Sequence, residues 1–182
     1  MPRAAPIRRG LFEVVFALVA LHAASPLWLV DHPPIQDLPQ HLAATRVLAD
    51  YGDPDLAFAR YFEVHLGRTQ YLAYYLAAIA SSWLVGVFAA NLLLLSLAIV
   101  ATPYALRALL RALDGDERLA LFALPLTWNA HLVLGFLNFV AAIPLAFFGL
   151  AVAVRLRRRF TRGRALGLAA LALVCFYTHV VP

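Results

Sequence analysis

"TQYLAYYLAAIASSWLVGVFAANLLLLSLAIVATPYALRALLRAL", residues 69–113, is an apolar stretch that is too long for one membrane crossing. A crossing helix needs about 20 mostly apolar residues. The stretch divides near Gly86, which predicts two spans over residues 69–85 and 87–110. Its aromatic side chains are of the kind that membrane–water interfaces favour: Tyr71, Tyr74, Tyr75 and Trp83.

The composition of the whole chain agrees with a membrane protein. Of 182 residues, 63% are hydrophobic and 14% are charged, against about 45–50% and about 25% in soluble domains. All 15 basic residues are arginine, and the net charge is +5. Six arginines lie in 155–164 and three precede residue 10. Short basic flanks beside spans are typical of cytoplasmic loops, so we expect no nucleic-acid partner and a cytoplasmic N-terminus.

Three further apolar blocks predict spans over residues 10–30, 133–154 and 165–181. If residues 119–132 also crossed the membrane, five spans would lie between the N-terminus and the Arg-rich loop at 155–164. An odd number of spans would put these two segments on opposite sides, whereas both are expected in the cytoplasm. This short piece carries Pro125 and polar side chains, so it is predicted to be re-entrant or interfacial. The expected fold is an all-α polytopic transmembrane bundle. It forms one membrane domain over 1–182, and the ending "FYTHVVP" suggests a fragment of a longer protein.

Residues 31–68 form the one long polar segment and are predicted to be an external loop. They hold six carboxylates and three arginines, a net charge of −3. Within them, "DLPQHLAATRVLADYGDP" predicts an amphipathic helix on the outer membrane surface. Asp37 suits its N-cap, and Gly52 suits a left-handed residue after its end. His41 follows Asp37 by four residues, on the same face.

This arrangement resembles the GT-C membrane glycosyltransferases, which include the protein O-mannosyltransferases and the lipid-A aminoarabinose transferases. The matching residues are "DLPQHLAATRVLADYGD", with Asp37 at the position of the catalytic carboxylate, and "RYFE" at 60–63, which ends in Glu63. The resemblance implies transfer of a sugar from a polyprenyl-phosphate donor to an acceptor at the external face of a bacterial inner membrane. Asp37 would act as general base. The implied substrate-binding residues are His41, Glu63, Arg60, Arg68 and His179, with the arginines facing the leaving phosphate.

Each of these residues also has a purely structural interpretation. Asp37 could cap its helix and do nothing else, and Arg60 and Arg68 could extend toward lipid headgroups. His179 could pack at an interface. Asn129, His131 and Asn138 could make interhelical hydrogen bonds or line a substrate cavity.

A divalent metal is a separate question that the sequence leaves open, and no cofactor is certain. Asp31, His32, Asp37 and His41 allow a metal site, although none of their spacings is diagnostic. Two other functions stay open beside the transferase: a transporter or lipid-handling protein, and a non-catalytic multi-span component. Membrane lipid is an expected partner of the protein. The position of Asp37 distinguishes the three. A transferase needs Asp37 to face a cavity open to lipid and external water, and a transporter needs polar groups near the middle of the membrane. A structural role needs Asp37 only to bond amides of its own helix.

Overall fold

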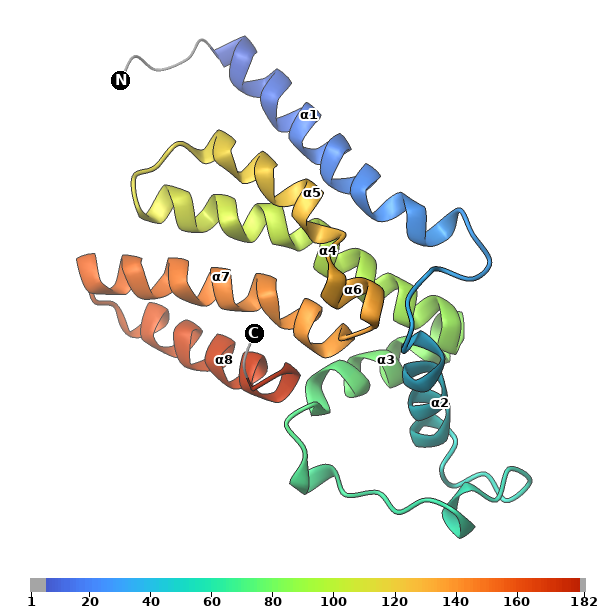
Figure 1. Cartoon of the computed structure of the whole chain (residues 1–182). Helices are drawn as coiled ribbons and strands as arrows, with labels where there is room; N and C mark the ends of the chain where they lie inside the picture. The colour runs from blue at the N-terminus through green and yellow to red at the C-terminus, as the bar shows by residue number, and fades with distance from the viewer. Residues whose placement is uncertain (1–5, 181–182) are drawn as a thin grey trace.

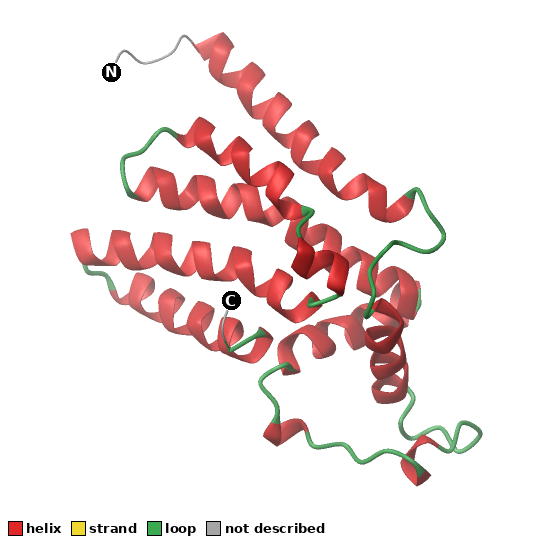
Figure 2. Ribbon diagram, viewed as in Figure 1, coloured by secondary structure: helices red, strands yellow, loops and turns green. Residues whose placement is uncertain are grey.

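The computed structural model describes residues 6–180, with side chains from Gly10 onward, and this part of the chain holds helices and loops without strands (Figure 2). The α-helices are α1 (Pro6–Ala24), α2 (Leu38–Ala49), α3 (Leu72–Val85), α4 (Val87–Ala112), α5 (Ala123–Thr127), α6 (Ala130–Leu134), α7 (Leu137–Arg158) and α8 (Arg162–Thr178). Short 3-10 helices are η1 (Ser25–Trp28), η2 (Phe58–Arg60), η3 (Leu66–Arg68) and η4 (Glu117–Phe122). The predicted all-α class is confirmed.

Three helical segments are long and apolar enough to cross a membrane: Gly10–Trp28, Val87–Ala112 and Leu137–Arg158. The protein is therefore built as an integral membrane protein. Helix α3 is also apolar but has only 14 residues. At 1.5 Å per residue it is about 21 Å long, which is less than the hydrocarbon core of about 30 Å.

Helix α4 forms the centre of the bundle and packs against α1, α3, α7 and η4 (Figure 1). Its buried face carries Leu92, Leu95 and Ile99. These side chains lie in the main core with Leu132 of α6 and Leu137 at the start of α7. Alanines such as Ala90, Ala98 and Ala105 are also buried along α4. Small side chains at such positions allow helices to approach closely, as is usual in membrane bundles.

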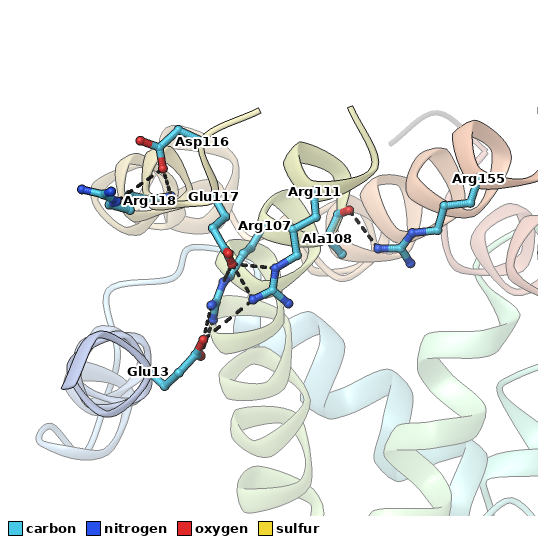
Figure 3. Close-up of polar contacts among 8 residues, drawn as sticks. All are labelled: Glu13, Arg107, Ala108, Arg111, Asp116, Glu117, Arg118 and Arg155. Carbon is cyan, nitrogen blue, oxygen red and sulfur yellow. Dashed lines mark hydrogen bonds and ion pairs between the residues drawn. The ribbon is translucent and has the colours of Figure 1, made fainter. Parts of the chain in front are cut away.

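Several polar contacts bring one end of α1, α4, η4 and α7 together, and we call it the Arg end. Arg158 pairs with Asp114 at 2.7 Å, and Arg155 donates to the carbonyl of Ala108 at 3.3 Å. At the same end, Glu13 of α1 pairs with Arg107 of α4 (Figure 3). The opposite end, which holds Asp37, is called the site end.

The sequence predicted a different side of the membrane for one of these loops. It implied that the turn at 114–118 lies opposite the Arg-rich loop, whereas the Asp114–Arg158 pair holds the two together. Residues 117–134 also differ from the expected re-entrant piece, because they begin at the Arg end and finish at the site end. Glu117 bonds Arg107, whereas the Val133 carbonyl bonds the Gln36 amide at 2.8 Å.

Residues 117–134 run the length of the bundle as three short helical pieces, η4, α5 and α6. Their polar groups are satisfied at the breaks. Asn129 accepts from the backbone amides of His131 and Leu132, and Thr127 donates to the Leu124 carbonyl. Irregular backbone at such depth requires partners of this kind, which explains why a broken segment is tolerated here.

Candidate functional site

Asp37 lies at the site end, where the loop after η1 enters α2. Its backbone is well fixed, because the neighbouring Gln36 amide bonds the Val133 carbonyl and the Asp37 carbonyl accepts from the His41 amide at 3.2 Å. Its side chain is half-buried and makes no capping hydrogen bond to α2. Asp37 is therefore the N-cap residue as predicted, but the interpretation that its carboxylate only caps the helix is wrong.

Gly135, between α6 and α7, packs directly against Asp37. Its φ is +91°, and a Cβ there would lie 2.6 Å from the Asp37 nitrogen and 2.7 Å from the Asp37 Cβ. Such distances are too short for any side chain, and L-residues also avoid this φ. Glycine is therefore required at 135, and the α6–α7 turn fixes the position of Asp37.

His41 connects three elements through its two ring nitrogens. Nε2 lies 3.0 Å from the Gly135 carbonyl, which can only accept, so Nε2 carries a proton. Nδ1 lies 2.8 Å from the Tyr75 hydroxyl and accepts from it in the neutral ring. Burial lowers the pKa of His41, although the Gly135 bond and the charge of Asp37 act in the opposite direction. The ring is neutral at pH 7, and both nitrogens are occupied.

Two polar networks continue beneath His41. The Asn138 side chain of α7 hydrogen-bonds Tyr75, is only 7% exposed, and leaves its Oδ1 without a partner among residues 6–180. Separately, Asn91 accepts from the Tyr74 hydroxyl at 2.9 Å and donates to Thr45 at 3.3 Å. Helix α2 thus packs on α3 and α4 through polar as well as apolar contacts. Whether it also lies on a membrane surface stays a prediction.

A row of rings borders this centre at the site end. His131 lies 5.8 Å from Phe136 and 4.7 Å from Phe139, measured between ring centroids. Phe139 lies 5.4 Å from His179, which lies 5.3 Å from Tyr71. The row begins one residue after Gly135, so it starts beside Asp37. His179 therefore lies at the same end of the bundle as Asp37, as expected.

The other predicted site residues are not joined to Asp37 by any contact within the described chain. Asp31 and His32 are exposed in the loop before α2. Glu63 pairs with His65 at 3.1 Å, and Arg60 and Arg68 are exposed. No group of three or more His, Cys, Asp or Glu among residues 6–180 could hold a metal ion. Both ring nitrogens of His41 are also occupied by hydrogen bonds, so the arrangement gives no support to a metal site at the candidate residues.

Sequence reasoning missed the roles of Tyr75 and Gly135. Tyr75 was assigned to a membrane interface, and nothing in the sequence near Gly135 pointed to Asp37. Asn138 was correctly singled out as a polar residue that bonds another helix. A useful signal would have been the presence of isolated polar groups in apolar segments, because each of them needs a partner.

A second polar centre closes the Arg end (Figure 3). Arg107, 4% exposed, forms a bidentate pair with Glu13 and bonds Glu117 at 2.6 Å. Arg111 also bonds Glu117. Burial raises the pKa of Glu117, but the bonds from Arg111 and Arg107 outweigh it and hold that pKa below its ordinary value. The two arginines balance the two carboxylates, so this centre is structural.

An apolar cavity of about 290 Å³ lies between α4, α5 and α7. Its lining includes Ile99, Leu106, Phe122, Leu126 and Phe147. Its polar members are Thr102, Thr127 and Asn129, and each of them hydrogen-bonds a backbone carbonyl within four residues. The cavity therefore suits hydrocarbon.

Comparison with known proteins identifies no relative: no family model, no curated protein and no solved structure matches the chain.

Proposed function

We propose that this protein is a glycosyltransferase that moves a sugar from a polyprenyl-phosphate donor to an acceptor hydroxyl at the non-cytoplasmic face of a membrane. The observation that carries the proposal is the state of Asp37. Its carboxylate is half-buried and makes no capping bond, while its backbone is fixed by Gly135 and Val133. A positioned carboxylate that is not used in folding is what a general base requires.

The proposed reaction is a single displacement. The acceptor hydroxyl gives its proton to Asp37 as its oxygen attacks the anomeric carbon. A new C–O bond forms, the bond from that carbon to the phosphate oxygen breaks, and polyprenyl phosphate leaves. Glu63, Arg60 and Arg68 remain proposed substrate contacts. They would have to approach Asp37 when substrate binds, because no contact joins them to it within residues 6–180.

Two features of the bundle suit such substrates. The ring row from His131 to Tyr71 offers aromatic faces, against which the apolar C–H face of a sugar can stack, and includes His179. The apolar cavity between α4, α5 and α7 suits part of a polyprenyl chain. Asn129, which starts α6, lines this cavity, so the cavity extends toward the site end.

The proposed orientation follows from charge. Arginines gather at the Arg end, in the last turn of α7 and the loop before α8. Such segments are usually cytoplasmic, which would put the N-terminus inside and residues 31–68 outside a bacterial inner membrane. The transporter alternative has less support. It would need paired broken helices in two related halves, whereas residues 117–134 are the one broken segment in the described bundle.

The test is Asp37→Asn, expressed in cells that lack the native gene. Loss of a general base lowers such rates by about 10²–10⁴-fold, so the sugar-modified product should disappear from the glycolipid and glycan profile by mass spectrometry. Asp55→Asn is the matched control, because Asp55 is an exposed carboxylate of the same polar segment and has no proposed role in the site. Membrane levels of both variants should equal wild type. A normal profile with Asp37→Asn would remove Asp37 from the mechanism.

A further inference from the structure

The chain between α2 and α3 extends away from the helical bundle (Figure 1). Its hydrogen bonds are local: Tyr51 donates to the Phe62 carbonyl at 2.8 Å, His65 pairs with Glu63, and the Tyr71 amide bonds Thr69. Residues 53–68 make no hydrogen bond to the bundle within the described chain. Hydrogen bonds to the bundle therefore do not fix the position of this segment.

Within this segment, three large apolar side chains are exposed although no helix of the bundle carries them. Tyr61 is 77% exposed, Phe62 49% and Leu66 43%. Tyr61 and Phe62 directly follow η2, and Leu66 begins η3. Exposed groups of this size mark an interaction surface when they gather on one short segment.

The arginines of the segment are also unpaired within residues 6–180. Arg60 and Arg68 are exposed and make no ion pair there, whereas Arg46, Arg107, Arg111 and Arg158 each have a carboxylate partner. Each unpaired guanidinium lies within two residues of an exposed apolar side chain: Arg60 beside Tyr61, and Arg68 two residues after Leu66. Apolar and cationic side chains that alternate in this way suit a lipid membrane, in which phosphate anions lie directly above the hydrocarbon chains.

We propose that residues 56–68 are a membrane-interface anchor, with Tyr61, Phe62 and Leu66 at the boundary between headgroups and acyl chains and with Arg60 and Arg68 on lipid phosphates. Aromatic rings favour that boundary, and arginine suits phosphate because of its fork geometry. The segment joins α2 to α3, which both pack on α4, and α4 is long and apolar enough to cross a membrane. The proposal concerns the protein without substrate and does not depend on glycosyl transfer; in the proposed reaction the two arginines would leave lipid phosphates to reach the leaving phosphate.

The single cysteine of the chain, Cys175, makes a direct test simple. In a Cys175→Ala background, new cysteines at Phe62 or Leu66 carry a nitroxide label, and Asp53→Cys is the control in the same loop. The labelled protein is placed in nanodiscs of phosphatidylethanolamine and phosphatidylglycerol. Electron paramagnetic resonance then measures collision of each label with oxygen, which concentrates in lipid, and with a water-soluble nickel complex.

We expect labels at 62 and 66 to collide with oxygen several-fold more than the label at 53, and with nickel several-fold less. Arg60→Gln with Arg68→Gln should move the label at 62 toward water. Labels at 62 and 66 as accessible to nickel as the label at 53 would overturn the proposal. Low collision with both reagents would also overturn it, because it indicates contact with protein, such as a second copy of the chain.

Discussion

Gly135 and Asp37 fit together only because residue 135 has no side chain: a Cβ on Gly135 would lie 2.6 Å from the Asp37 nitrogen. The α6–α7 turn and the start of α2 are far apart in sequence, and this contact aligns them. The His41 ring strengthens the same junction through its bond to the Gly135 carbonyl. The geometry of the candidate site therefore depends on one backbone contact.

Gly135→Ala should destabilise the protein. A non-glycine residue at a φ of +91° is strained by about 1–3 kcal/mol, and the clash with Asp37 adds to this. Unfolding in detergent, followed by circular dichroism, measures the change. Gly149→Ala is the control, because Gly149 lies within α7 with open space around its Cβ position. A helix gains about 0.5–1 kcal/mol from that substitution, so equal destabilisation of both variants would contradict this account.

Tyr75→Phe should also lower stability. The change leaves Nδ1 of the partly buried His41 without its donor, which costs about 1–3 kcal/mol. The unfolding midpoint in denaturant measures the loss. Tyr177→Phe removes an exposed hydroxyl and should change the midpoint little. If the two variants match, the His41–Tyr75 bond contributes nothing.

The pKa of His41 predicts a pH dependence. It is lowered by burial from an ordinary value of 6.5, so the unfolded chain binds a proton more readily than the folded protein does. Stability from His41 is complete above about pH 6.5 and falls as the pH decreases below it. His41→Gln should reduce the loss of stability between pH 6.5 and 5.5, measured as the unfolding midpoint. The other five histidines are unchanged in that variant, so parallel curves for the two proteins would exclude His41 as the cause.

Arg107→Met should loosen the Arg end. The change leaves Glu13 and Glu117 facing each other without the buried cation. Both carboxylates are partly exposed, so the cost should fall below the roughly 3–5 kcal/mol of a fully buried pair. Arg118→Met, at a side chain 72% exposed, should stay within about 0.5 kcal/mol of wild type. Thermal unfolding of both variants in detergent ranks them, and similar midpoints would show that the cluster does not stabilise the bundle.

Local features of the sequence predicted local features of the fold. Apolar block length indicated a helical membrane protein, and "DLPQ" correctly marked where α2 begins. The left-handed glycine expected at Gly52 was wrong, because the glycines with positive φ are Gly86 and Gly135. Those two lie at junctions whose geometry is set by other helices, which a single segment cannot reveal.

The order of the bundle ends could not be obtained from the sequence for a similar reason. The parity of cytoplasmic ends required one apolar piece not to cross, but it did not say which. Residues 119–132 and α3 are both short, and the contact that distinguishes them is the Asp114–Arg158 pair, which joins residues 44 positions apart. The Asp37–Gly135 contact is equally non-local, so the sequence could not reveal which residues hold Asp37 in position.

Helices α3 and α4 are joined by Gly86 alone, whose φ of 82° and ψ of 161° are open in practice only to glycine. Tyr75 lies eleven residues before this joint, about 16 Å along α3. A rotation of about 5° at Gly86 would therefore displace the Tyr75 hydroxyl by more than about 1 Å, enough to break its bond to His41. A small change in the angle between α3 and α4 would therefore alter the hydrogen bonding of His41, which lies one turn after Asp37 in α2.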